Sequence, residues 1–342
     1  MNQDQWNGLL TVLQGEPVDP LPVGFIIDSP WLPGWAGIST LDYYASESLW
    51  VEANLKAIRS FPSVWFLPGF WSEFGMCTEP SAFGAKCIWQ ENALPFAERT
   101  METAAQMAAL QKPDVRQDGL LPFMLKRLGH ALPAIEAEGH AIRFAVARGP
   151  LNIATFLLGT TEFMMAIKES PQETHALLAT ITDFLCDWIR LQKEALSTIE
   201  GIFLLDDLVG FLGKTDFAEF VLPYLKRAFH AIDAKVRFFH NDAHGLVCAP
   251  FLAEIGVNLF NFSFKHSLTQ MREAAGESVT LLGNLPPRDV LAAGGPEQVR
   301  QGLREMRRSL GNRRVILSVG GGMAPGTSTA NLQAFIEAAR EK

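Results

Sequence analysis

Residues 235–244 read Lys-Val-Arg-Phe-Phe-His-Asn-Asp-Ala-His, an apolar run that ends in a cluster of polar groups. A run of this length and composition predicts a buried β-strand. Alternate residues of a strand share a face, so His240 and Asp242 project the same way, and His244 follows in the next loop. Two imidazoles and a carboxylate can bind a divalent metal such as zinc or carry out acid–base chemistry.

Short apolar runs of the same kind recur along the chain, separated in most cases by helical patterns. Counting the opening run, eight are found, at 22–28, 63–69, 141–148, 201–207, 235–242, 258–262, 278–284 and 314–320. Eight βα units predict an α/β fold, a closed (β/α)8 TIM barrel, as a single domain over residues 1–342. The alternative, a doubly wound sheet, usually carries a G-x-G-x-x-G turn after its first strand, and this chain lacks one.

The segment 70–118 is longer than a connection between the second and third strands requires. It is rich in Trp, Phe, Gly and Pro, and we expect an inserted lid that folds over the barrel mouth. Cys77 and Cys87 lie within it. A thiol ligand reaching the mouth is conceivable, but a packed or free cysteine is the more common role.

Composition limits the classes of function. The chain has 342 residues, 48% of them hydrophobic, and a formal net charge of −8. An acidic chain without a basic patch argues against nucleic-acid binding. Four cysteines without a CxxC spacing indicate a reducing, cytoplasmic setting. With neither a signal-peptide core nor an apolar run of about 18 residues, no membrane association is expected.

In a TIM barrel the functional groups lie where the strands end. Polar residues follow nearly every predicted strand, and burying so many of them without a ligand would be costly. We therefore expect a small-molecule substrate at the mouth. The candidate catalytic residues are Asp207, His240 and Asp242; the candidate substrate-binding residues are Asp28, Trp35, Trp71, Glu73, Arg148 and Asn284.

Several of these residues allow a structural role as well. Asp206 and Asp207 are adjacent, so only one can face the barrel axis, and the other should cap a segment or pair with a cation. Arg148 can place a cation in the mouth or pair with Asp207. The aromatic residues in the strand-end loops can wall a pocket or belong to the core. The glycines 320–322 would let backbone approach a ligand closely or cradle an anion.

Several motifs resemble the uroporphyrinogen decarboxylase-like superfamily. The Asp-Asp-Leu strand end within 204–208, the Leu-Pro-Tyr-Leu-Lys helix within 220–226 and the Phe-His-Asn-Asp strand end at 239–242 resemble its central motifs. Gly-Asn-Leu-Pro-Pro at 283–287 and the glycine-rich stretch 320–332 are similar to its last two strand ends. The resemblance spans roughly residues 20 to 340 and implies the same barrel.

The resemblance implies two alternative chemistries. True uroporphyrinogen decarboxylases carry an early arginine motif that holds the substrate carboxylates, whereas residues 28–35 here contain no arginine. The zinc-dependent methyltransferases of the superfamily hold zinc through a His-x-Cys pair and a later cysteine. Here His240 is kept, Asp242 replaces the first cysteine, and Met323 stands near the second.

We therefore expect a methyltransferase or demethylase that moves a methyl group between a small methylated compound and a thiol or a corrinoid. The corrinoid would be carried by a separate partner protein. Zinc or another divalent metal would be held by His240 and Asp242, with His244 or Asp207 as a further ligand. One alternative is a metal-free decarboxylase or lyase of a small carboxylic acid or tetrapyrrole-like substrate, in which Asp207 or Asp242 protonates a carbanion and Arg148 holds the carboxylate. The other is a binding protein without catalysis.

Overall fold

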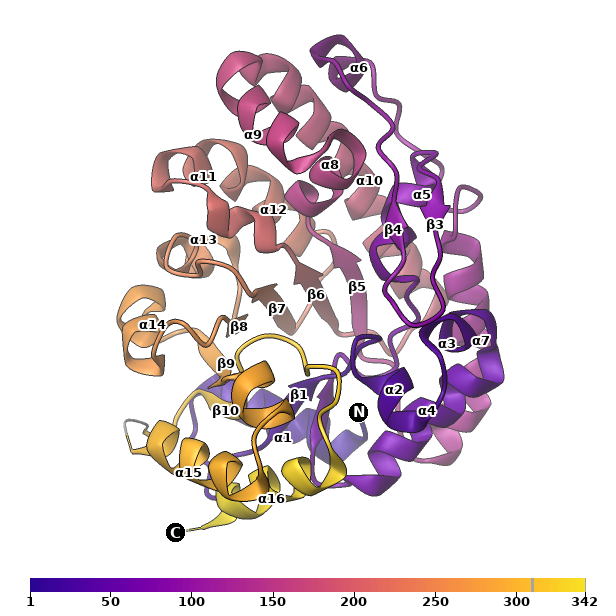
Figure 1. The fold of residues 1–342 in the computed structure, drawn as a ribbon. Helices are drawn as coiled ribbons and strands as arrows, with labels where there is room; N and C mark the ends of the chain where they lie inside the picture. The colour runs from indigo at the N-terminus through magenta and orange to yellow at the C-terminus, as the bar shows by residue number, and fades with distance from the viewer. Residues whose placement is uncertain (309–310, 342) are drawn as a thin grey trace.

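The computed structural model describes residues 1–308 and 311–341 and shows strands alternating with helices around a central barrel (Figure 1). Each of the eight predicted runs contains a strand, shorter than predicted because the outer residues belong to turns. These strands are β1 (Gly24–Ile26), β2 (Trp65–Leu67), β5 (Phe144–Arg148), β6 (Gly201–Leu205), β7 (Val236–Asn241), β8 (Leu259–Phe262), β9 (Thr280–Leu285) and β10 (Val315–Val319).

The strands are parallel and follow one another in chain order. Six of them form one sheet in the order β10-β9-β8-β7-β6-β5, and β1 pairs with β2. A parallel bridge between Val23 and Leu317 joins β1 to β10, with the Leu317 N–H donating to Pro22 O at 2.9 Å. The predicted (β/α)8 fold is confirmed, with one departure: in the described residues no ladder joins β2 to β5.

Side chains satisfy the open edge of β5 in place of a strand. Gln192, fully buried on helix α10 (Pro171–Ala195), accepts from Val146 N at 2.9 Å and donates to Val146 O at 3.0 Å. Glu79 accepts from Arg148 N at 3.0 Å. Buried backbone groups need partners, and these two side chains supply them where the ladder stops. We call this gap between β2 and β5 the seam.

The barrel interior is filled by large apolar side chains. Phe203 and Phe238 stack with their ring centroids 4.3 Å apart, and Trp71 meets Phe203 edge-on at 5.9 Å. Helix α1 (Gln3–Gln14) closes the N-terminal end, where Trp6 packs on Phe144. The barrel interior is therefore a packed core, and the C-terminal mouth is where a ligand is expected to bind.

The helices surround the barrel (Figure 1). Besides α1 and α10 they are α2 (Leu32–Ala36), α3 (Thr40–Ala45), α4 (Glu47–Ser60), α7 (Leu121–Ala137), α8 (Pro150–Leu158), α9 (Thr160–Glu169), α11 (Lys214–Phe220), α12 (Leu222–Phe229), α13 (Leu252–Ile255), α14 (Leu268–Ala275), α15 (Pro296–Arg307) and α16 (Thr329–Arg340). Among the described residues no single helix is long and apolar enough to cross a membrane; only the bent pair α8–α9 has the length and composition when its two helices are taken together.

The segment 70–118 enters at the seam. It contains a 3₁₀ turn η1 (Gly75–Cys77), α5 (Thr78–Ala82), the antiparallel pair β3 (Cys87–Ile88) and β4 (Phe96–Ala97), and α6 (Ala104–Ala108). Helix α5 packs against α7 and α8, and α6 against α10. Figure 1 shows the β3–β4 hairpin rising beside the barrel, with α6 beyond it. A lid function for this segment stays a prediction.

Candidate active site

The ends of β6 and β7 bring Asp207, His240 and Asp242 together at the mouth. Asp207 Oδ1 accepts from the Asp242 backbone N–H at 2.6 Å. His240 Nε2 lies 3.6 Å from the same oxygen, beyond hydrogen-bonding distance. His240 is only 6% exposed, whereas the Asp207 side chain is 40% exposed. The three residues predicted as catalytic thus form one group, which combines a buried imidazole with two carboxylates open to the mouth.

Asn261, on the neighbouring strand β8, fixes the orientation of His240. The Asn261 Nδ2 group faces two backbone carbonyls, Leu282 O at 2.9 Å and Val319 O at 3.1 Å. Carbonyls only accept, so the opposite atom of the amide must be Oδ1, which lies 2.8 Å from His240 Nδ1. His240 therefore donates from Nδ1, and in its neutral form the lone pair on Nε2 faces the mouth and Asp207.

The Asp242 carboxyl is perturbed by its surroundings. Asp242 is exposed as a residue, but the protein atoms around its carboxyl exclude part of the solvent, and this desolvation raises its pKa to about 6. The His240 ring opposes this rise, the Asp207 carboxylate adds to it, and the cations of Arg288 and Lys265 oppose it. A carboxyl with this pKa can hold or release a proton near neutral pH, as a general acid or base requires.

Asp206 and Asp207 divide as expected, with one facing inward and the other acting as a cap. Asp206 is fully buried and accepts from Leu151 N at 2.9 Å and Asn152 N at 3.1 Å. These N–H groups begin helix α8, which follows β5. The helix start therefore holds this carboxylate, and Asp207 alone is available to a ligand.

A second polar group lies where β1 and β2 end. Glu73 is 2% exposed; it accepts from Ser29 Oγ at 2.7 Å and pairs with Arg148 Nη2 at 3.2 Å. Arg148 also donates to Gly75 O at 3.2 Å and lies over the Trp71 ring. Arg148 therefore pairs with Glu73 and not with Asp207, which settles the alternative left open by the sequence. The positive charge of Arg148 is therefore largely balanced by Glu73 within the protein.

Asp28 belongs to the same group. Burial raises the pKa of its carboxyl well above the ordinary value, and the Glu73 carboxylate adds to the rise. Its Oδ1 has no hydrogen-bond partner within the described residues. A buried carboxyl beside another carboxylate favours its protonated form, in which its O–H can donate a hydrogen bond to a ligand.

The glycine turn after β10 separates the two groups. A Cβ on Gly321 would lie 2.7 Å from Asp242 Oδ2, and one on Gly322 would lie 2.8 Å from Asp28 Oδ2. Gly321 also has φ +113°, which side chains disfavour. Any larger residue would press on one of these carboxyls, so the glycines keep the mouth open between Asp28 and Asp242.

The other predicted residues are more dispersed. Trp35 stacks on Trp31 and donates to Thr329 Oγ1 at 3.0 Å, and Trp71 packs inside the barrel, so both contribute to packing. Asn284, 8% exposed, donates to His266 O at the end of β9. His244 packs edge-on against the His266 ring, with the centroids 4.8 Å apart.

Two residues were missed by sequence reasoning. Asn261 is the single polar residue in the apolar run Leu259–Phe262, a signal that could have singled it out. Arg288 follows Pro286-Pro287 after β9 and lies close enough to Asp242 to affect its pKa. Neither Arg288 nor Lys265 has an ion-pair partner among the described residues.

The donor set does not fit the zinc–thiolate site that the resemblance implies. The residue after β10 that faces Asp242 is Gly321, which has no side chain, and Met323 is buried. No group of three or more His, Cys, Asp or Glu side chains with metal-site spacing occurs in the described chain. The metal predicted at His240, Asp242 and His244 therefore stays a prediction without a matching donor set.

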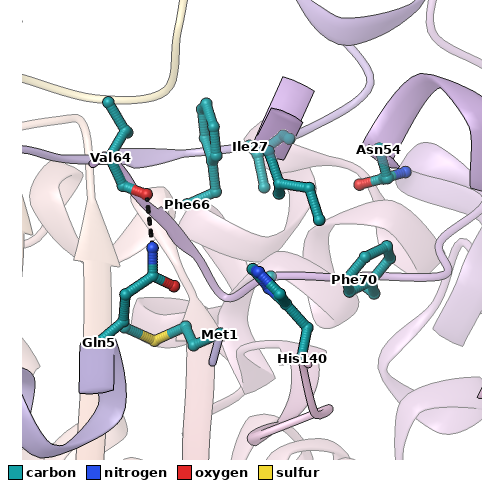
Figure 2. A pocket seen from close by; sticks show the side chains of 10 residues that line it. Met1, Gln5, Ile27, Asn54, Val64, Phe66, Phe70 and His140 are labelled. Atoms are coloured by element: carbon teal, nitrogen blue, oxygen red, sulfur yellow. Dashed lines mark hydrogen bonds between the residues drawn. The ribbon is translucent and has the colours of Figure 1, made fainter. Parts of the chain in front are cut away.

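A small cavity lies outside the barrel near the seam. It measures about 10 Å³ and is lined by residues that include Met1, Gln5, Phe70 and His140. Figure 2 shows the His140 ring between Met1 and Phe70, with Gln5 donating to Val64 O at 3.3 Å. A space of this size holds at most about one water molecule, so it is not a substrate site.

The sequence model of the family described as "Uroporphyrinogen decarboxylase (URO-D)" matches residues 5–342. The chain belongs to the uroporphyrinogen decarboxylase family. It is 24% identical to the uroporphyrinogen decarboxylase of Pseudomonas syringae pv. tomato, over 97% of this chain and 96% of that protein. It is also 24% identical to the human uroporphyrinogen decarboxylase, over 84% of this chain and 79% of that protein.

Solved structures share the fold of this family member. A methyltransferase from Methanosarcina mazei superposes with a TM-score of 0.79 at 20% identity, covering 97% of this chain and 96% of that one. A B12-independent methionine synthase from Shewanella sp. superposes with a TM-score of 0.56 at 12% identity, covering 94% and 98%. At these identities the likeness shows the barrel alone.

Proposed function

We propose that this family member catalyses removal of a methyl group from a small methylated compound, with Asp242 as the proton donor. The observation that carries the proposal is the Asp242 carboxyl at the mouth, whose pKa burial raises to about 6. When a methyl group leaves an oxygen, nitrogen or sulfur atom, that atom gains electron density, and a neighbouring acid lowers the barrier by protonating it. Asp207 and His240 would hold the ligand beside this acid.

The charges at the mouth disfavour a substrate with many carboxylates. Asp28, Asp207 and Asp242 all face it, while the Arg148 guanidinium is taken up by Glu73 and Gly75. A tetra-acid would meet several carboxyls, and its carboxylates would outnumber the two cations near the mouth that have no ion-pair partner in the described residues, Arg288 and Lys265. This supports a small substrate over the porphyrinogen of the curated relatives.

For the methyl acceptor we propose a thiol or a corrinoid carried by a separate protein. Two observations support this choice: the motif resemblance to the methyltransferases of the superfamily, and the name of the Methanosarcina mazei neighbour, a methyltransferase. Because the donor set lacks thiolates, no step of the proposal depends on a metal. Elemental analysis of the purified protein and turnover after chelation would test the metal separately.

The second candidate is a decarboxylase of a small acid. The observation that favours it is the pair of cations, Arg288 and Lys265, which act on Asp242 without ion pairs of their own in the described structure. They could hold a carboxylate of the substrate while Asp242 protonates the carbanion left by CO2.

One experiment separates the two reactions. The protein is incubated with a panel of methylated compounds and free cob(I)alamin while methylcobalamin absorbance is followed, and in parallel with small acids while CO2 is measured. Methyl transfer is expected, and Asp242→Asn should lower it by a factor of roughly 10² or more. The matched control, Asp289→Asn, changes an exposed carboxylate on η4 (Pro287–Ala292) and should keep full activity. If Asp242→Asn transfers methyl groups at an undiminished rate, the proposal is refuted. If CO2 is released and no methyl group is transferred, the second candidate is favoured.

A further inference from the structure

The Asp207–His240 pair presents two hydrogen-bond acceptors to the same point. Asn261 Nδ2 is committed to two carbonyls, so His240 must donate from Nδ1 and keeps its Nε2 lone pair when neutral. The second acceptor, Asp207 Oδ1, lies 3.6 Å from His240 Nε2. A carboxylate oxygen and an imidazole lone pair repel each other, and no N–H or O–H lies between them.

When His240 is neutral, none of the described residues places a donor between these two acceptors. Asp207 cannot turn away easily, because its Oδ1 accepts from Asp242 N at 2.6 Å. His240 cannot turn either, because it is 6% exposed and tied to Asn261. A ligand hydroxyl placed at the mouth would donate to one of these acceptors and relieve their opposition.

The surrounding charge defines the rest of the ligand. Lys265 and Arg288 follow the ends of β8 and β9 at the mouth. The loop of Lys265 lies against the glycine turn, because a Cβ on Gly320 would clash with Phe264 N. Both cations are exposed and have no ion-pair partner in residues 1–308 and 311–341. Two unpaired cations beside the site can hold one carboxylate of a ligand.

We propose that the mouth binds a small hydroxy acid, with its hydroxyl donating to the Asp207–His240 pair and its carboxylate on Arg288 and Lys265. Asn261 is the positioning residue that keeps His240 an acceptor. The proposal rests on the proposed function only in placing the substrate at this mouth. Binding tests it without any turnover, so failure of methyl transfer would leave it intact.

The first test is the tautomer of His240. In ¹⁵N-histidine-labelled protein, two-bond proton–nitrogen spectra at pH 8 should show the Nδ1–H form for the signal that disappears in His240→Gln. An Nε2–H form would overturn the proposal, because Nε2 would then be a donor.

The second test compares matched probes by NMR titration: glycolate against acetate, and 4-hydroxybenzoate against benzoate. At least one hydroxy acid should bind about tenfold more tightly than its partner, a difference of about 1.4 kcal/mol, since hydrogen bonds to a charged group are stronger than those between neutral groups. Equal affinities within both pairs would overturn the proposal.

Two variants separate the two contacts. Asp207→Ala removes one acceptor and should reduce the preference for the hydroxy acid to about twofold or less. Lys265→Gln should weaken both members of a pair by the same factor and keep the preference. A preference that survives Asp207→Ala, or one that Lys265→Gln abolishes, would contradict the assignment of the contacts.

Discussion

The adjacent carboxylates Asp206 and Asp207 should differ sharply in what their loss does to stability. Replacing Asp206 with Asn exchanges one acceptor oxygen for an amide group that faces the N–H of Leu151 or Asn152. One of the two bonds, 2.9 and 3.1 Å long, is lost at a fully buried site. A hydrogen bond to a charged group contributes about 1.5–3 kcal/mol.

The expected cost of Asp206→Asn follows from two opposing effects. The NH2 group of the new amide and the backbone N–H opposite it are then two donors without an acceptor. This moves the loss in free energy of unfolding to the upper end of that range. The amide carries no charge to bury, which lowers the cost, and burial already raises the pKa of Asp206 well above the ordinary value. We therefore expect Asp206→Asn to lower the free energy of unfolding by about 2–3 kcal/mol.

Asp207→Asn is the matched control. The Asp207 side chain is 40% exposed, and an amide oxygen can still accept from Asp242 N. Its cost should stay within about 0.5 kcal/mol. The measurement is urea unfolding followed by tryptophan fluorescence, with equal slopes required for the comparison. Equal losses in both variants, or a loss under 0.5 kcal/mol for Asp206→Asn, would refute the assignment of Asp206 as the cap of α8.

Three further changes test other parts of the structure. Gly321→Ala puts a Cβ 2.7 Å from Asp242 Oδ2, so ligand affinity should fall roughly tenfold (1.4 kcal/mol). Gly326 also has a positive φ but open space around it, so Gly326→Ala should leave ligand affinity unchanged and lower the free energy of unfolding by about 1–2 kcal/mol through backbone strain. Arg148→Met leaves Glu73 buried without its cation and should cost about 3–5 kcal/mol in urea unfolding; adding Glu73→Gln should restore part of that loss, and an additive double variant would argue against the pair. Burial lowers the pKa of His140 from 6.5 to about 4. Folding therefore favours the neutral ring, and stability should be full above pH 6.5 and decline as the pH falls towards 4, by on the order of 1–3 kcal/mol; His140→Gln should flatten this slope, and an unchanged slope would show that His140 is not responsible.

Much of the fold follows from local pattern. Each of the eight apolar runs contains a strand, because strands buried on both faces need continuous apolar side chains. The adjacency argument for Asp206 and Asp207 also held, although both residues lie just beyond β6: Asp206 follows Leu205, and Asp207 begins the 3₁₀ turn η2 (Asp207–Phe211). The grouping of Asp207, His240 and Asp242 follows from the parallel pairing of β6 and β7, which brings the ends of both strands to the same edge.

What the sequence could not provide depends on contacts between distant residues. The partner of Arg148 is Glu73, 75 residues earlier, and nothing local distinguishes it from Asp207. The role of Asn261 depends on two carbonyls from other strands, and the seam depends on Gln192 from a helix far along the chain. Trp35 and Trp71 have the composition of a pocket wall, but Trp35 is half-buried on α2 and stacks on Trp31, and Trp71 is buried beside Phe203.

The seam has a consequence for how the barrel opens. A β-ladder breaks cooperatively along its length, whereas the bonds from Gln192 and Glu79 to β5 can break one at a time. The same gap is where the segment 70–118 leaves the barrel, so movement of that segment need not disrupt a ladder. In amide hydrogen exchange, Val146 and Arg148 should therefore exchange before the amides of β7 and β8, so that the barrel opens locally at the seam while β7 and β8 stay paired.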